Sequence, residues 1–389
     1  MMLQVVRLKF VEFQKFQWKG KIMGDYPPQY YSPRARKYYR KRPSVAGGGG
    51  AGVSSVGGWK ELGRTTLGSA GNNIDVSSLP DKRYYMILGS AFPSGNTYGG
   101  LRFNSDSGTN YSSRRSENGG ADGTTTSDSK IFFNRGVSVY PANMLFSVGY
   151  VANYSSKEKL SIIHGVTDGG SSAGNDPERL QCVGKWTNTS NAISSINNVQ
   201  LDSGSWNTGS ELIVLGYDPA DTHTTTDNFW EEIYSTTLES DSSTSNAQFD
   251  TGAFTGKKYL WIQIFADANF DPLIRFNSDT GNNYASRTSY NGATDSTNIN
   301  TSHTNTGATF VASNIGFGNI FIVNVANKEK LGICNGVRVD TLGAGTSPNF
   351  KGENVFKWTN TSNQITSMQI EKGSGTLRAG TTIKIWGAD

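Results

Sequence analysis

The stretch RFNSDSGTNYSSR, residues 102–114, returns almost letter for letter as RFNSDTGNNYASR, residues 275–287. A segment of this length does not recur by chance. The repeat spacing is 173 residues at this point, far above the roughly 20 to 50 residues of solenoid repeats. Each copy is therefore expected to be a whole domain with its own core.

The match extends outward from this stretch in both directions. The spacing between equivalent residues stays between 171 and 175. The tetrapeptide KEKL begins at Lys157 and Lys328, and the heptapeptide KWTNTSN begins at Lys185 and Lys357. The chain therefore contains one module twice, behind a leader of a different kind.

The composition is typical of a β protein rich in turns. Of 389 residues, 46 are glycine, 11% are aromatic and only 17% are charged. Short alternating or apolar runs between turn residues predict eight or nine strands in the first copy, which fits a jelly roll better than a seven-stranded immunoglobulin-like domain. The expected fold class is all-β, with two tandem antiparallel β-sandwich (jelly-roll-like) domains from an internal duplication, preceded by a basic flexible arm.

The repeat also sets the expected domain boundaries. Residues 1–58 are a basic, glycine-rich N-terminal arm and linker, and residues 59–218 are the first sandwich. Residues 219–228 are a polar linker, and residues 229–389 are the second sandwich. Because the linker is short, the two sandwiches are expected to pack side by side.

Positive charge is concentrated in the first 58 residues. They carry eleven Lys and Arg against two acidic residues, a net charge of +9. The whole chain carries +4, so the remaining residues sum to −5. Such asymmetry points to a polyanionic partner that a tail binds.

The densest part of the arm, YYSPRARKYYRKR at residues 30–42, interleaves cations with tyrosines. Cationic side chains neutralise phosphates, and tyrosine rings stack on unpaired bases. The residues expected to bind nucleic acid are Arg34, Arg36, Lys37, Tyr38, Tyr39, Arg40, Lys41 and Arg42. Two alternatives stay open, a basic tail without a ligand and a tail that docks on an acidic membrane surface.

The duplicated loop offers side-chain oxygens at Asn104, Asp106 and Asn110. The equivalent residues are Asn277, Asp279 and Asn283. Calcium needs roughly six to eight oxygens, and this loop supplies too little negative charge, so a tight turn is the expected role. Binding of sugar hydroxyls by these loops and their flanking tyrosines stays open.

The tryptophans and lysines of the repeated motifs, and the two cysteines, are expected to be structural. Trp186 and Trp358 end strands and are expected in the core, with a carbohydrate platform as the alternative. Residues 157–159 and 328–330, from the two KEKL motifs, are expected as solvated strand starts. Cys182 and Cys334 do not occupy corresponding positions and are expected as reduced core thiols.

No motif supports catalysis, so no enzyme activity, catalytic residue, metal or cofactor is expected. His164, His223 and His303 share no position of the repeat, and the chain lacks GxSxG, HExxH and a phosphate-binding glycine loop. No pair of carboxylates stands out as a glycosidase pair. No hydrophobic run is long enough to span a bilayer, and charged residues interrupt any signal peptide, so no membrane partner and no secretion by the usual route are expected.

At the ends of the two copies stand KWTNTSNAISSINNVQLDSGSWNTGSELIVLGYD and KWTNTSNQITSMQIEKGSGTLRAGTTIKIWGAD. Together with the FNSDxGxNY stretch, they resemble a domain of viral and bacteriophage structural proteins, found in capsid, head-fibre and tail-associated chains. The likeness covers most of residues 59–389. The basic arm followed by glycines resembles the genome-facing arm of small icosahedral-virus capsid proteins. Two sandwiches in tandem depart from the usual single one and resemble double-jelly-roll capsid proteins or a shell domain with a projecting domain.

The resemblance implies a capsid protein located in the virion. Its partners would be other copies of itself, in a homo-oligomeric shell, and the viral genome, which the arm neutralises. The alternative is a virion fibre or adhesin whose sandwich loops bind a host surface glycan.

Overall fold

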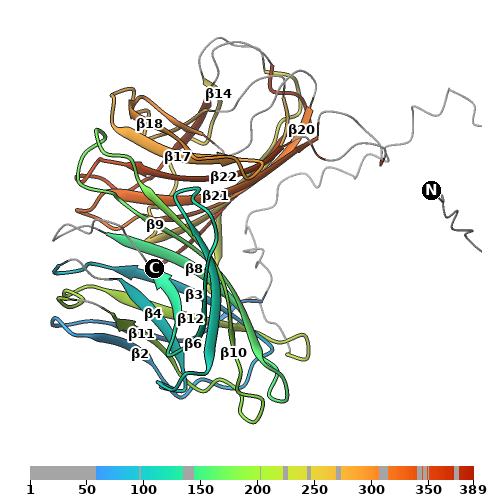
Figure 1. Cartoon of the computed structure of the whole chain (residues 1–389). Coiled ribbons are helices and arrows are strands. Elements are labelled where there is room, and N and C mark those ends of the chain that lie inside the picture. Colours follow the sequence, from blue (N-terminus) through green and yellow to red (C-terminus); the bar gives the residue numbers. More distant parts are fainter. Residues whose placement is uncertain are drawn as a thin grey trace, which may run out of the picture. The chain divides into compact units, whose positions relative to one another are not determined.

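Every regular element that the structure describes is a β-strand. The computed structural model describes residues 58–389 apart from 96–97, 135–143, 202, 222–226, 243–246, 269–272, 306–313, 340–343, 345–347, 349 and 372–375. The described residues belong to one compact unit (Figure 1). None of them lies in a helix that is long and apolar enough to cross a membrane.

Twelve strands form the first half of this unit. They are β1 (Lys60–Thr66), β2 (Asn73–Val76), β3 (Tyr84–Ala91), β4 (Gly99–Phe103), β5 (Tyr111–Glu117), β6 (Gly123–Asp128), β7 (Ile131–Asn134), β8 (Leu145–Ala152), β9 (Lys159–Thr167), β10 (Glu178–Trp186), β11 (Ile196–Gln200) and β12 (Glu211–Tyr217).

Twelve more strands form the second half. They are β13 (Glu231–Thr237), β14 (Ala247–Asp250), β15 (Tyr259–Ala268), β16 (Leu273–Phe276), β17 (Tyr284–Tyr290), β18 (Ser296–Thr301), β19 (Thr304–Asn305), β20 (Asn314–Val323), β21 (Lys330–Val339), β22 (Phe350–Trp358), β23 (Met368–Glu371) and β24 (Thr382–Ala388).

The two halves have the same strand order. The first has an 8-stranded sheet, β1-β12-β3-β8-β9-β10-β5-β6, and a 4-stranded sheet, β2-β11-β4-β7. The second has β13-β24-β15-β20-β21-β22-β17-β18 and β14-β23-β16-β19, which is the same order with twelve added to each strand number. The predicted fold class, two tandem antiparallel β-sandwiches from an internal duplication, is confirmed.

The number of strands in each copy was underestimated, because twelve strands replace the predicted eight or nine. The edge strand β6 is one of the strands that the prediction left out. It has the sequence GTTTSD and no buried residue. A strand whose two faces are both polar shows no apolar alternation, so sequence periodicity does not detect it.

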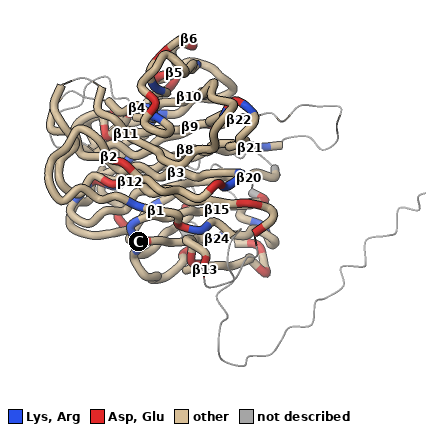
Figure 2. Tube along the Cα trace, turned by 90° about the horizontal axis from the view of Figure 1, so that it is seen from below, with Lys and Arg blue, Asp and Glu red and all other residues tan. Residues whose placement is uncertain are grey.

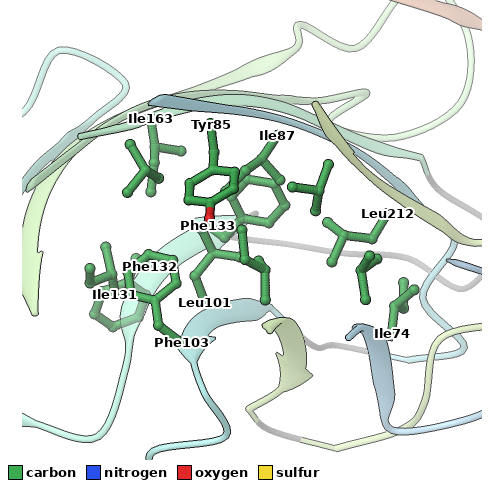
Figure 3. Packing of buried hydrophobic residues seen from close by; sticks show 14 of the residues in the cluster. Ile74, Tyr85, Ile87, Leu101, Phe103, Ile131, Phe132, Phe133, Ile163 and Leu212 are labelled. Atoms are coloured by element: carbon green, nitrogen blue, oxygen red, sulfur yellow. The ribbon is translucent and has the colours of Figure 1, made fainter. Parts of the chain in front are cut away.

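Each half has its own core between its two sheets. In the first half, Tyr85 and Ile87 of the large sheet face Leu101 and Phe103 of the small one (Figure 3). All four side chains are fully buried, and Ile87, Leu101 and Phe103 each contribute about 1.5–3 kcal/mol by leaving water. The second half has an equivalent core around Ile262, Phe276 and Trp358.

A third buried cluster joins the halves across the outer faces of their large sheets. From the first half it contains Met86, Leu88, Phe92, Met144, Phe146, Val148, Val166, Ile213 and Leu215. From the second half it contains Trp230, Tyr259, Phe321, Val323, Leu331, Ile333, Val355, Trp386 and Ala388. The sandwiches therefore pack on each other, as the short linker predicts, and β9 contacts β21 (Figure 1).

Candidate functional site

The duplicated loop between β4 and β5 is closed by hydrogen bonds to Asp106. Its carboxylate accepts from the Gly108 amide at 2.9 Å, the Asn110 side chain at 2.9 Å and the Trp186 indole at 2.7 Å. Asn104 and Ser105 have φ angles of 55° and 54°, in the left-handed region that such tight turns use. Burial acts to raise the Asp106 pKa, but the bonds from Trp186 and Asn110 outweigh it, and the pKa is lowered.

The second copy repeats this geometry. Asp279 accepts from the Gly281 amide at 2.9 Å, Asn283 at 3.0 Å and the Trp358 indole at 2.7 Å. The carboxylate oxygens of Asp106 and Asp279 already accept hydrogen bonds from donors within the protein. A calcium ion would have to displace these donors. Among the described residues, no group of three or more His, Cys, Asp and Glu side chains is placed to hold a metal ion. The geometry supports turn architecture.

The repeated tryptophans lie in the core, as predicted, because Trp186 is 1% exposed and Trp358 is fully buried. The expectation of solvated strand starts in the KEKL motifs is wrong for their third residue, since Lys159 and Lys330 are also fully buried. Lys159 Nζ donates to the Asn188 carbonyl at 2.8 Å and lies over the Trp186 ring. The loop carbonyl and the ring replace water around the ammonium group.

The equivalent lysine in the second half makes the same contacts. Lys330 Nζ donates to the Asn360 carbonyl at 2.7 Å and lies 5.8 Å from the Trp358 ring centroid. Burial lowers the pKa of Lys330 to about 8. Because neither indole faces solvent, the tryptophans do not form a carbohydrate platform in this structure.

The remaining candidate nucleophiles and bases are the two buried cysteines, the partly buried His164 and His303, and His223. Cys182 and Cys334 are buried and form no disulfide, which confirms their prediction as reduced core thiols, and burial raises the pKa of Cys182 to about 12. Burial also lowers the pKa of His164 and of His303. His223 lies among the residues that the structure does not describe.

Polar contacts surround the apolar cluster between the halves. Arg179 of the first half lies 2.7 Å from Asp295 and 3.0 Å from Glu353 of the second. Tyr259 donates to Glu211 at 2.9 Å. These contacts fix how the second half sits on the first.

An open apolar groove on the first half is the main candidate for a binding site in the described part of the chain. Its floor is formed by Leu160, Ile162 and Val183, which are 57%, 53% and 49% exposed. The groove has a volume of about 510 Å³. The residues around the floor are polar or small: Ser112, Ser113, Arg114, Thr124, Thr125, Thr126, Ser161, Gly184 and Lys185.

This groove has the chemistry of a docking surface. Its lining contains no His, Cys, Asp or Glu. Its charged residues Arg114 and Lys185 each form an exposed ion pair, with Asp122 and Glu158. The groove is not among the predicted sites, although the sequence carries a signal for it. In β9, Leu160 and Ile162 point outward while Ile163 points into the core. Apolar residues on both faces of an antiparallel strand predict that both faces are covered.

The residues predicted to bind nucleic acid all lie outside the described residues. They are Arg34, Arg36, Lys37, Tyr38, Tyr39, Arg40, Lys41 and Arg42. Within the described part, acidic and basic residues are interspersed along the tube in Figure 2. The concentrated positive charge is therefore a property of the arm sequence alone.

Comparison with models of protein families and with curated protein sequences gave no match. Among solved structures, the chain is similar to the mouse laminin alpha1 chain, domains LG4-5, at 9% identity and a TM-score of 0.19, covering 86% of this chain and 91% of that chain. It is also similar to a chain assigned as a MaoC domain protein dehydratase from Chloroflexus aurantiacus J-10-fl, at 8% identity and a TM-score of 0.12, covering 62% and 73%. At these TM-scores neither likeness carries an argument about function.

Proposed function

We propose that the chain is a capsid protein, a structural protein of a virus particle that assembles with other copies into a shell. In this proposal the N-terminal arm neutralises the packaged nucleic acid. The observation that carries the proposal is the segregation of charge, +9 in the first 58 residues against −5 in the rest. A phosphate backbone is attracted to the first segment and repelled by the second.

The described residues support a structural role. They form two β-sandwiches that are held together by a continuous apolar cluster. The polar motifs repeated in both copies, around Asp106 and Asp279, are used to close loops. The chain also exposes an apolar groove with a polar border, which suits contact with another protein surface better than contact with a small polar substrate.

A salt titration of binding to single-stranded oligonucleotides tests the arm. The arm places six cations between Arg34 and Arg42, and six phosphate contacts predict that log K falls against log salt with a slope of about −4. A chain that begins at Gly58 is expected to lose this binding. The matched control replaces the six cations by Gln and keeps Tyr38 and Tyr39, which separates charge from stacking.

Electron microscopy of the full-length protein tests the shell. The proposal would be supported if the parent chain forms closed particles that contain nucleic acid. The variant without the six arm cations should still form closed particles, but empty ones. Equal oligonucleotide binding by the full chain and the truncated chain would contradict it.

The alternative function is a virion fibre or adhesin that binds surface carbohydrate through its loops. Burial of Trp186 and Trp358 removes the tryptophan platform, which was one of the candidate glycan contacts of this alternative. The adhesin would be favoured if the protein without its arm still bound a glycan array. Elongated particles instead of closed ones would favour it too.

A further inference from the structure

The two halves meet through different patches on the outer faces of equivalent large sheets. The second half contributes Leu331, Ile333 and Val355, from β21 and β22, which we call face A. The first half contributes Met144, Phe146 and Val166, from the start of β8 and from β9, which we call face B. The contact therefore joins face A of one sandwich to face B of the other, and it is heterologous.

Face A is present a second time, on the first half. The KEKL and KWTNTSN motifs make Leu331, Ile333 and Val355 equivalent to Leu160, Ile162 and Val183, with the same residue type at each position. In the second half these side chains are 0%, 3% and 1% exposed. In the first half they are 57%, 53% and 49% exposed and form the floor of the groove.

Face B is present a second time, on the second half. Strand pairing gives the equivalence, since Phe146 pairs with Val166 and Phe317 pairs with Val337. Met144, Phe146 and Val166 are at most 2% exposed. Their equivalents Ile315, Phe317 and Val337 are 37%, 39% and 38% exposed, and Phe265 beside them is 45% exposed.

The polar residues beside face A are also repeated. In the second half, Lys357 donates to the Asp168 carbonyl at 2.7 Å and Arg287 donates to the Pro177 carbonyl at 2.8 Å. Their equivalents in the first half are Lys185 and Arg114, whose side chains are 42% and 59% exposed. The side chains that orient the internal contact thus recur at the exposed copy of face A.

We propose that the exposed face A on the first half of one chain binds the exposed face B on the second half of another copy. The arrangement would repeat the contact that joins the two halves within a chain. This deepens the proposed function, and it rests on that function for its biological role. Because each chain carries one exposed copy of each face, association continues head to tail into a closed ring or an open filament.

The contact between copies is weaker than the internal one. Glu211, which accepts from Tyr259 and Lys258 at the internal contact, is equivalent to Thr382 in the second half. Met144, Phe146 and Val166 keep apolar equivalents, whereas Leu88, Val148 and Ile213 of the same cluster are equivalent to Gln263, Asn319 and Lys384. The charged acceptor is lost as well. Association is therefore expected to be reversible and to depend on protein concentration.

Two single variants of the full chain test the inference by analytical ultracentrifugation over a range of concentrations. Ile162→Lys blocks face A, and Phe317→Lys blocks face B. Both positions are exposed, so both variants are expected to fold, which thermal unfolding checks. The control is Ile299→Lys, at a 46% exposed isoleucine of β18 that belongs to neither face.

Each blocked variant alone is expected to be monomeric, while the control assembles like the parent chain. A one-to-one mixture of the two variants is expected to stop at a dimer, because one intact face A meets one intact face B and nothing remains to extend the pair. A parent chain that stays monomeric, blocked variants that assemble like the control, or a mixture that stays monomeric would overturn the proposal.

Oligonucleotide binding by the same variants separates this inference from the proposed function. Parent chains that assemble but do not bind nucleic acid would contradict the genome-neutralising role. The proposed contact between face A and face B would be unaffected. If Ile162→Lys or Phe317→Lys still forms closed particles that hold nucleic acid, the proposed contact is contradicted and the capsid function is not.

Discussion

The indole nitrogen of Trp186 lies 2.7 Å from a carboxylate oxygen of Asp106, and this bond is reproduced at 2.7 Å between Trp358 and Asp279. Each bond connects the end of a long strand, β10 or β22, to the turn that follows β4 or β16. The turn and the strand are therefore fixed by one charge-assisted contact in each half.

Asp106→Ala is expected to lower the free energy of unfolding by about 1–3 kcal/mol, because it leaves the buried Trp186 indole without an acceptor. Urea unfolding measures the change. Asp122→Ala is the control, since Asp122 forms an exposed ion pair with Arg114 and its loss is expected to change stability by less than about 1 kcal/mol. Equal effects of the two substitutions would contradict the structural role of Asp106.

The two aspartates are expected to make the fold sensitive to acid. Their folded-state pKa values are lowered below the value of about 3.9 for an unfolded chain. The stability they contribute is therefore present above about pH 4 and is lost as the pH falls through the lowered folded-state pKa. The double variant Asp106→Asn/Asp279→Asn should show a shallower loss of stability in acid unfolding curves, and an unchanged slope would count against this origin.

Trp186→Ala and Trp358→Ala are each expected to cost about 3–5 kcal/mol of stability, since both side chains are buried and the change leaves a large cavity. Chemical unfolding monitored by circular dichroism measures the cost. If either variant kept the parent's stability but lost glycan binding, the tryptophan would have a binding role instead of a packing role.

Lys330 is expected to make the fold more stable as the solution becomes alkaline. Burial lowers its folded-state pKa from 10.5 to about 8. Between these values the unfolded chain holds more protons than the folded chain, so the free energy of unfolding rises with pH. Comparison of urea unfolding at about pH 7.5 and about pH 9.5 should show a rise in the parent that is reduced in Lys330→Met. Lys157→Met, at an exposed lysine, should keep the rise.

Arg179→Ala is expected to destabilise the contact between the halves by about 3–5 kcal/mol, because it leaves the buried Asp295 carboxylate without its ion-pair partner. Asp295, which lies 2.7 Å from Arg179, has a side chain that is 1% exposed. Calorimetry should resolve a lowered transition, and Arg114→Ala, which breaks an exposed pair, should not. An unchanged transition in Arg179→Ala would contradict this account of the contact.

The repeat in the sequence predicts the fold well because a duplicated pattern constrains both copies together. The spacing between Trp186 and Trp358 implies equivalent strands at these positions, and the two halves have the same strand order. Periodicity missed β6 and β18, because their residues are exposed or only partly buried. Lys159 was misjudged because a lysine is buried only where its ammonium group finds partners, and the Asn188 carbonyl that binds it lies 29 residues away.

The outward apolar residues of β9 indicate a covered face, but the repeat does not tell which copy of that face stays exposed. Leu160 and Leu331 are the same residue in the same motif, yet one is 57% exposed and the other is fully buried. The difference comes from packing between the halves, which no local pattern records. The nucleic-acid-binding residues from Arg34 to Arg42 stay a prediction, since they lie outside the described residues.

The internal contact between Leu331 and the first half has a consequence for the order of events after synthesis. Two halves on one polypeptide meet at an effective concentration in the millimolar range for a short connection, whereas separate chains meet at whatever concentration the cell supplies. The intramolecular pairing therefore saturates first, and each newly made chain leaves folding as a two-sandwich unit. Association between these units would begin only when the protein concentration is high enough. The level of expression would therefore set the time of assembly.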